Sequence, residues 1–216
     1  MTPNKEDYLK CIYEIGTDMQ KITNKEIAAR MQVSPPAVTE MIKRMKSENL
    51  ILKDKENGYL LTDIGLKLVS ELYRKHRLIE VFLVHHLDYT SDQIHEEAEV
   101  LEHTVSDLFV KRLDKLLGFP QTCPHGGTIP AEGELLVEIN NLPLATVQEA
   151  GTYLLTRVHD SFELLKYLEK HEIHIGDQLQ VKQFDSFSNS FTLVNKDEDL
   201  QVSMDIAKQL YVEKIN

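Results

Sequence analysis

Two carboxylates and one imidazole recur at helical spacing in the segment EVLEH. Glu99, Glu102 and His103 stand at positions i, i+3 and i+4, which would place their side chains on one face of an α-helix. Both kinds of side chain bind divalent first-row metal ions. A single group of acids and histidines on a helix is more often a solvated face, so a metal-binding interpretation needs further candidate ligands.

Such candidates occur on neighbouring segments. His76 and Glu80 are four residues apart on the preceding expected helix, and His95 stands one turn before Glu99. Two antiparallel helices could bring these side chains together with the EVLEH set. Asp7, on the expected first helix, adds a candidate oxygen ligand. The spacing therefore favours a metal-binding cluster over a solvated face.

The segment CPHGG holds a third pair, Cys123 and His125. An exposed turn of this kind could donate a thiolate and an imidazole side by side, but a buried small cysteine beside a loop histidine fits the sequence equally well. Cys11 stands on the apolar stripe of the first helix, where core packing is expected. Two cysteines this far apart make no disulfide framework, which indicates a reducing compartment.

The N-terminal residues, 1–63, have the pattern of a winged helix–turn–helix. A short helix is expected over Asn24–Met31, followed by a turn at Ser34 and a second helix opened by Pro35. Two apolar runs, Leu50–Leu52 and Tyr59–Leu61, flank a charged turn and indicate a β-hairpin, the wing.

The outer face of the second helix is small and polar, as expected of a helix that enters the major groove of DNA. From this helix, base edges or phosphates would be approached by Ser34, Pro36, Thr39, Glu40 and Lys43. From the helix end and the wing, phosphates would be contacted by Lys46, Lys53 and Lys55. The alternative is a three-helix bundle with no role in DNA binding.

The charge distribution favours the DNA-binding interpretation. The whole chain carries a net charge of −11, yet residues 1–75 hold 13 Lys and Arg against 11 Asp and Glu. The remaining residues hold 11 basic and 24 acidic side chains. A mildly basic head on an acidic body fits a DNA-binding module joined to a domain of another function.

The rest of the chain predicts two further domains. Long helices are expected over residues 62–87 and 90–118, followed by a Pro- and Gly-rich loop. From about residue 146, short alternating runs predict a small β-barrel. We therefore expect a mainly α protein with a small β part, divided into residues 1–63, 64–140 and 146–216. There is no apolar run long enough to span a bilayer and no signal peptide, so a cytoplasmic protein without membrane contact is expected.

Together, the winged start, the helices with HRLIE and EVLEH, the CPHG loop and the C-terminal barrel resemble the DtxR/MntR family of metal-dependent repressors. The long three-domain, streptococcal-type manganese repressors are the most similar members. The barrel resembles the SH3-like, FeoA-type module. The resemblance implies a primary metal site of Asp7, Glu99, Glu102 and His103. It implies a second site of Glu80 and His76 with either His95 or the pair Cys123 and His125, and with Asp160 reaching over from the barrel.

The resemblance also implies a function. Iron-sensing members have Met and Cys where Asp7 and Glu99 stand, and carboxylates favour Mn²⁺ over softer ions. Fe²⁺, Zn²⁺ or Cd²⁺ would act as substitutes in vitro. Lys10 stands where compact manganese members carry a second acid, which argues against a bridged two-manganese centre. We expect a homodimeric repressor of metal-uptake genes that binds double-stranded operator DNA, with no enzymatic activity and no organic cofactor.

Two alternatives remain open from the sequence. One is a winged-helix regulator that senses iron or another ligand, its acids and histidines being surface residues. The other is a di-metal carboxylate enzyme built on a helical bundle. That enzyme would need two Glu-x-x-His motifs, and the helix–turn–helix would have no role in it.

Overall fold

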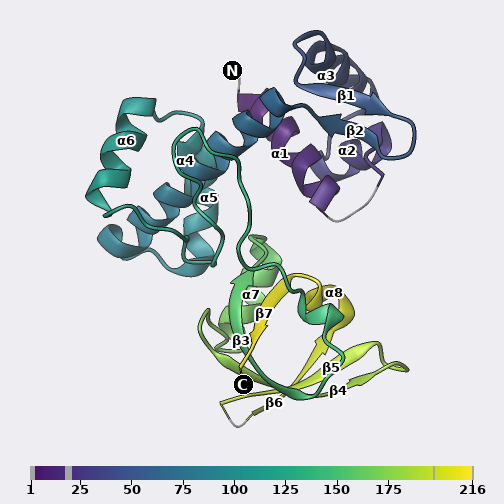
Figure 1. Ribbon diagram of the computed structural model, residues 1–216, viewed down its shortest axis with the longest axis vertical. Coiled ribbons are helices and arrows are strands. Elements are labelled where there is room, and N and C mark those ends of the chain that lie inside the picture. Colours follow the sequence, from purple (N-terminus) through teal and green to yellow (C-terminus); the bar gives the residue numbers. More distant parts are fainter. Residues whose placement is uncertain (1–2, 18–20, 197, 216) are drawn as a thin grey trace. The chain divides into compact units, whose positions relative to one another are not determined.

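The computed structural model describes residues 3–17, 21–196 and 198–215, and the chain forms two compact units (Figure 1). The first unit comprises Met1–His76, Glu102–Val105 and Pro130–Leu136. The second comprises Arg77–Leu101, Ser106–Ile129 and Val137–Asn216. Within the described ranges, no helix is both long enough and apolar enough to cross a lipid bilayer.

The fold is mainly α with a small β part, which confirms the expected fold class. The helices are α1 (Pro3–Thr17), α2 (Asn24–Met31), α3 (Pro35–Ser47), α4 (Asp63–Leu87), α5 (Ser91–Glu102), α6 (Asp107–Leu116), the 3₁₀ helix η1 (Leu144–Thr146), α7 (Phe162–Lys170) and α8 (Met204–Ala207). The strands are β1 (Ile51–Asp54), β2 (Gly58–Leu61), β3 (Gly151–Val158), β4 (Gln178–Asp185), β5 (Ser190–Asn195), β6 (Glu198–Ser203) and β7 (Leu210–Lys214).

The first unit contains the expected winged helix–turn–helix. Apolar residues at helical spacing on α1 pack against Ile27 of α2 and against Val38, Ile42 and Met45 of α3, all buried. Cys11 belongs to the same core, as its place on the stripe of α1 predicts. This shared core fixes the angle at which α3 presents its polar face to solvent.

The wing is an antiparallel pair in which Ile51 faces Leu61 and Asp54 faces Gly58. Its turn is closed by Asp54 Oδ1, which accepts hydrogen bonds from the backbone N–H groups of Glu56 and Asn57 at 2.8 and 2.7 Å. Ile22 adds a bridge beside Gly58, since the Tyr59 N–H donates to the carbonyl of Ile22 at 3.1 Å. The hairpin is therefore joined to the segment that precedes α2.

The single helix expected over residues 90–118 is wrong, because the structure has two helices, α5 and α6, separated by a turn. Ser106 begins the second helix: its backbone is extended and its hydroxyl accepts a hydrogen bond from the N–H of Phe109 at 3.2 Å. His103 consequently lies in the turn just after α5, rather than on a continuous helical face.

The C-terminal part of the second unit is a five-stranded antiparallel sheet in the order β6–β5–β4–β3–β7. Strands β4 to β7 match the alternating runs, while β3 is an additional strand that pairs with β4 on one side and β7 on the other. Inward positions of the strands form a core that includes Leu155, Leu179, Leu193, Val202 and Leu210. Helices α7 and α8 contribute further apolar side chains to the same core.

We expect Gly58→Ala to destabilise the first unit strongly. Gly58 has a φ of +86°, and an added Cβ would lie 1.9 Å from the carbonyl oxygen of Ile22. Gly133→Ala is the matched control, because Gly133 has a φ of +79° but open space around it. The control carries only the strain of a left-handed residue, about 1–2 kcal/mol.

In chemical denaturation, Gly58→Ala should lower the free energy of unfolding by at least about 2 kcal/mol more than Gly133→Ala does. Equal losses in the two variants would contradict the close contact between the wing and Ile22.

Candidate functional site

The first unit brings together one complete group of candidate metal ligands. Asp7 comes from α1, Glu102 from the last position of α5 and His103 from the turn that follows. One ligand atom from each lies within 4.8 Å of the other two. His103 Nε2 is 2.9 Å from Asp7 Oδ1 and 3.4 Å from Glu102 Oε1.

These separations fit a metal ion. With bonds of about 2.2 Å, adjacent ligand atoms lie about 3 Å apart and opposite ones about 4.4 Å apart. The donor set is two carboxylates and one imidazole, which suits divalent first-row ions. The group therefore meets the distance and chemical requirements of a metal centre.

Neighbouring side chains hold these candidate ligands in place. The second ring nitrogen of His103, Nδ1, lies 2.7 Å from Glu6 Oε2, which orients the imidazole. The Glu102 side chain is buried, and its Oε2 lies 2.6 Å from His76 Nδ1. Glu6 is not among the ligands or supporting residues that the sequence predicts. Its position beside Asp7 was the one available signal.

A second group lies in the second unit. Glu80 on α4, Cys123 and His125 are all buried, with one ligand atom of each within 4.8 Å of the others. Glu80 Oε1 is 3.1 Å from His125 Nδ1. Asp160, just after β3, approaches the same nitrogen with Oδ1 at 3.6 Å. The barrel thus contributes a carboxylate to the group formed by α4 and the CPHGG loop.

His95 adds an imidazole to this group. Its Nδ1 lies 3.0 Å from Asp160 Oδ1, and its Nε2 lies 3.8 Å from Glu99 Oε1, one turn along α5. The structure therefore gathers Glu80, His95, Cys123, His125 and Asp160, and it pairs His76 with Glu102 in the first unit. The inclusion of Glu99 in the primary site stays a prediction.

The second group carries an excess of negative charge. Burial opposes protonation of His125, but the carboxylate of Glu80, the side chain of Cys123 and the charge of Asp160 together outweigh it and raise the pKa of His125 to about 11. Burial also raises the pKa of the Cys123 thiol, and the charge of Glu80 adds to the effect. Such strong retention of protons shows that positive charge stabilises this cluster. A divalent metal ion would supply that charge in place of the protons.

The backbone of the CPHGG loop is fixed by hydrogen bonds. The Cys123 N–H donates to Gly127 and the Gly126 N–H donates to Cys123, both at 2.9 Å. The carbonyl of His125 accepts a hydrogen bond from Val158 of β3 at 3.0 Å. Gly126 has a φ of +78°, and a Cβ there would lie 2.0 Å from the carbonyl oxygen of Thr156. The loop therefore packs so closely on β3 that only glycine fits.

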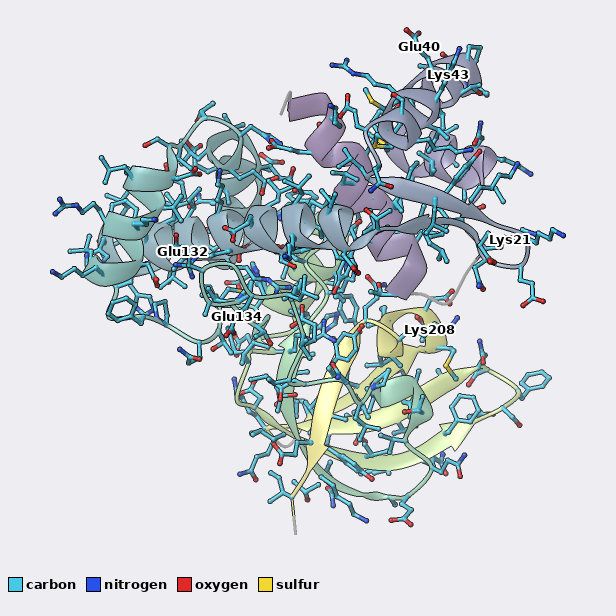
Figure 2. The ribbon with its side chains drawn as sticks, turned by 45° about the horizontal axis from the view of Figure 1, so that its top comes forward. Lys21, Glu40, Lys43, Glu132, Glu134 and Lys208 are labelled. Carbon is cyan, nitrogen blue, oxygen red and sulfur yellow. The ribbon has the colours of Figure 1, made fainter. Side chains whose placement is uncertain are left out.

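The candidate nucleic-acid face lies on α3 and the wing. All eight side chains named for this role are exposed: Ser34, Pro36, Thr39, Glu40, Lys43, Lys46, Lys53 and Lys55. Figure 2 shows Glu40 and Lys43 on the outer side of α3. Ser34 occupies the N-cap of α3 without a side-chain capping hydrogen bond, and Pro35 and Pro36 fill the first two positions of the helix.

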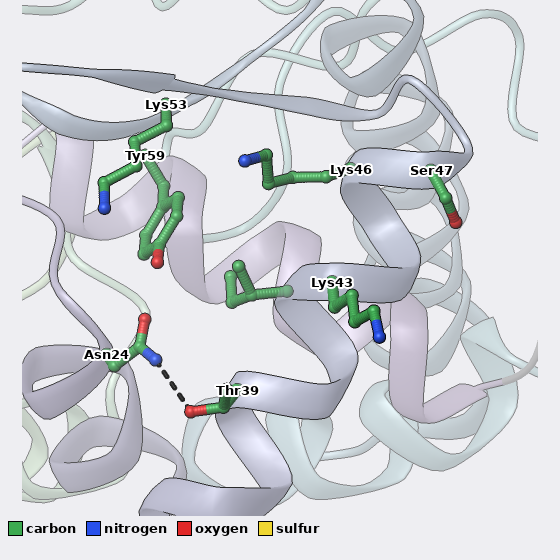
Figure 3. A pocket seen from close by; sticks show the side chains of 8 residues that line it. Asn24, Thr39, Lys43, Lys46, Ser47, Lys53 and Tyr59 are labelled. Carbon is green, nitrogen blue, oxygen red and sulfur yellow. Dashed lines mark hydrogen bonds between the residues drawn. The ribbon is translucent and has the colours of Figure 1, made fainter.

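A pocket of about 460 Å³ lies between α3 and the wing (Figure 3). Lys43, Lys46 and Lys53 line it, and among the described residues no carboxylate pairs with any of these three ammonium groups. Asn24 Nδ2 donates to Thr39 Oγ1 at 3.0 Å at its edge. Asn24 and Tyr59 also line this pocket but were not predicted to belong to the DNA-binding face, because their place there follows from tertiary packing.

Comparison with known proteins matches all three parts of the chain. The family described as "Iron dependent repressor, N-terminal DNA binding domain" matches residues 1–59. "Iron dependent repressor, metal binding and dimerisation domain" matches residues 62–131, and the FeoA domain matches residues 142–214. The crystal structure of ScaR with bound Zn²⁺ is 63% identical, covering 98% of this chain and 99% of that one, with a TM-score of 0.94.

The chain belongs to the DtxR/MntR family of metal-dependent transcriptional repressors. The structure of the manganese regulator SloR is 59% identical over the full length of both chains, with a TM-score of 0.91. The diphtheria toxin repressor of Corynebacterium diphtheriae is 26% identical over 97% of this chain and 96% of its own. This DtxR/MntR-family repressor is therefore a DNA-binding, dimer-forming regulator, and the enzyme alternative is set aside.

We expect Glu138→Gln to weaken the support of the CPHGG loop in a pH-dependent way. Arg77 Nη2 lies 2.6 Å from Glu138 Oε1, and Glu138 Oε2 accepts a hydrogen bond from the Thr128 N–H at 2.9 Å. Burial disfavours the carboxylate, but Arg77 and the N–H of Thr128 outweigh it and hold the pKa of Glu138 below its usual range. The variant should lose roughly 1–3 kcal/mol at neutral pH.

The pKa of Glu138 is lower in the folded protein than in the unfolded chain. The carboxylate therefore stabilises the fold fully at pH values above its unfolded pKa, and this stabilisation is lost as the pH falls through its folded pKa. The difference in unfolding free energy between wild type and Glu138→Gln should therefore be constant near neutral pH and narrow as the pH falls below about 4.5, the usual pKa of a glutamate. Denaturant titrations at several pH values measure it, with the exposed Glu134→Gln as control. A difference that is constant with pH would contradict the charged Arg77–Glu138 pair.

Proposed function

We propose that this protein is a manganese-activated, homodimeric repressor that binds operator DNA of metal-uptake genes in the cytoplasm. The observation that carries the proposal is the convergence of Asp7, Glu102 and His103 within 4.8 Å. We assign DNA binding, dimerisation with metal binding, and an SH3-like module to residues 1–63, 64–140 and 146–216, respectively.

The choice of Mn²⁺ is supported by the ligands and by the relatives. Asp7 and Glu102 supply hard oxygen atoms and His103 an imidazole, with no sulfur in the first group. Such a set accommodates Mn²⁺. SloR, 59% identical, is described as a manganese regulator, and ScaR, 63% identical, as a manganese-activated repressor. Structures of ScaR carry Zn²⁺ or Cd²⁺, so these ions, like Fe²⁺, would substitute in vitro.

A bound divalent ion would supply the positive charge that holds several carboxylates together. Asp7 on α1 would then be joined to Glu102 and His103, with Glu99 as the expected fourth ligand. Since α1 packs on the core that positions α3, this connection would restrict the orientation of the recognition helix. A dimer must present two such helices about 34–36 Å apart, or at a multiple of that distance. DNA affinity would rise with the population of the competent arrangement.

The second group would be a subordinate metal site. Its expected ligands are Glu80, Cys123, His125 and Asp160, with His95 or His76 as further candidates. The Cys123 sulfur makes this group softer than the first one. Asp160 would contribute to metal binding from the barrel, which supports a role for this module in adjusting the response to metal rather than in DNA contact.

The decisive experiment is DNA binding by the metal-stripped protein, with and without added Mn²⁺. Fluorescence anisotropy on the region upstream of a metal-transporter gene would serve, with unrelated DNA of equal length as control. We expect tight, specific binding only when Mn²⁺ is present. Binding that ignores the metal would contradict the proposal and favour a winged-helix regulator with another signal.

We expect His103→Ala to abolish the response to Mn²⁺ without unfolding the dimer. Loss of a residue that only supports a ligand typically costs 10–100-fold in metal affinity, so loss of a ligand should weaken Mn²⁺-stimulated DNA binding by at least about tenfold. The control is His174→Ala, which removes an exposed histidine far along the chain in the barrel. Circular dichroism and light scattering verify folding and dimerisation. An unchanged Mn²⁺ response in His103→Ala would refute the assignment of the first site.

We expect Lys53→Ala to weaken binding to all DNA sequences alike. Lys53 is an exposed wing residue whose ammonium is not paired with a carboxylate among the described residues. Loss of one phosphate contact should reduce the slope of log affinity against log salt by about 1. Lys182→Ala, on β4 and paired with Asp199, serves as control. A changed base preference with an unchanged salt slope would count against a phosphate contact.

A further inference from the structure

Lys10 is a buried lysine beside the first candidate metal site. It stands one turn after Asp7 on α1, and its side chain is only 11% exposed. Its ammonium nitrogen lies 3.5 Å from Oε1 of Glu102, a side chain that is 0% exposed. The same nitrogen lies 5.6 Å from the centre of the Tyr73 ring, within the range of a cation–π interaction. The chain itself therefore supplies a cation to this site.

The two oxygens of Glu102 have different surroundings. Oε2 lies 2.6 Å from His76 Nδ1, so one side of the carboxylate is held by an imidazole. Oε1 faces both the ammonium of Lys10 at 3.5 Å and His103 Nε2 at 3.4 Å. Lys10 therefore approaches the same Glu102 oxygen, Oε1, that faces the other candidate metal ligands.

We propose that Lys10 is a tethered counter-cation of Glu102, which stabilises the metal-free protein and lowers the affinity of the first site for metal. The inference rests on the metal site assigned under the proposed function. A buried carboxylate without a cation is strongly destabilising, so the Lys10 ammonium stabilises the metal-free state. When Glu102 Oε1 coordinates a divalent ion, the ammonium must either remain near two further positive charges or leave its buried position. Both outcomes oppose metal binding.

The two possible roles of Lys10, counter-cation or purely structural residue, predict opposite effects of its removal on metal affinity. Removal of a lysine that only supports the fold would lower the stability of the protein with and without metal, and would leave metal affinity unchanged or weaker. Removal of a counter-cation would lower the stability of the metal-free protein and tighten metal binding. Lys10 is therefore a positioning residue that sets the metal concentration of the response, and the two effects can be measured separately.

The test uses Lys10→Met, which keeps an unbranched side chain and removes the charge. The matched control is Lys5→Met, because Lys5 is a second buried lysine of α1 but pairs with Glu48 instead of Glu102. Lys10→Arg retains the charge and should resemble the wild type. All variants are made in the full-length protein carrying Cys123→Ser and His125→Ala, so that binding at the second group does not obscure the first.

The probe is Mn²⁺ alone. Competition with a fluorescent chelator gives its dissociation constant, electron paramagnetic resonance counts the bound ions, and thermal unfolding is followed in metal-stripped and Mn²⁺-saturated protein. We expect Lys10→Met to unfold at a lower temperature when metal-stripped and to bind Mn²⁺ on the order of tenfold more tightly. Lys5→Met should lose stability in both states without a gain in affinity.

An unchanged or weaker affinity for Mn²⁺ in Lys10→Met would overturn the inference, as would tightening in Lys5→Met. If the metal-stripped Lys10→Met does not fold, Lys10→Gln replaces it and the same comparison decides. His103→Ala in the same background separates this inference from the proposed function. If His103→Ala still binds Mn²⁺ with full affinity, the metal site itself is wrong. If it loses Mn²⁺ while Lys10→Met shows no tightening, only the role of Lys10 is wrong.

Discussion

The first candidate site depends on one constraint, the compensation of a carboxylate that is removed from water. Glu102 is 1% exposed, and the cost of burying its charge must be offset by nearby cations and donors. His76 satisfies one oxygen, and the other faces Lys10 and His103. Because these partners come from α1, α4 and the turn after α5, the charge of Glu102 ties three segments of the chain to one point. When a different cation neutralises Glu102, all three segments are affected.

This arrangement explains how a small ion could control a much larger DNA surface. The helix that carries Asp7 also supplies the core against which α2 and α3 pack, so its position and that of the recognition helix are linked through apolar contacts. Linkage makes the effect reciprocal: operator DNA should tighten metal binding by the same factor by which metal tightens DNA binding. The exposed lysines between α3 and the wing would supply the sequence-independent part of that DNA affinity.

Residues with a local signature were predictable from the sequence. The spacing of Asn24–Met31, the two prolines that open α3 and the Asn57–Gly58 turn define the winged helix–turn–helix, and the structure confirms it. The break between α5 and α6 was not predicted, because the hydrophobic periodicity continues across it. Only the N-cap residue Ser106 marks the start of a new helix. Glu6 and Lys10 were not predicted to be partners of His103 and Glu102. The packing of helices distant in sequence decides which side chains face these two residues.

The two groups of candidate ligands differ in a way that argues for different roles. The first contains oxygen and nitrogen donors only, is partly accessible through Asp7 and already includes a lysine as an internal cation. The second includes the sulfur of Cys123 from a loop fixed on β3, and its carboxylates help to raise the pKa of His125 to about 11 although burial opposes this. An internal cation allows the first site to exist in a stable metal-free form, as a sensor requires. A bound ion would stabilise the carboxylates of the second group, which suits a site that stabilises the junction of the CPHGG loop with β3.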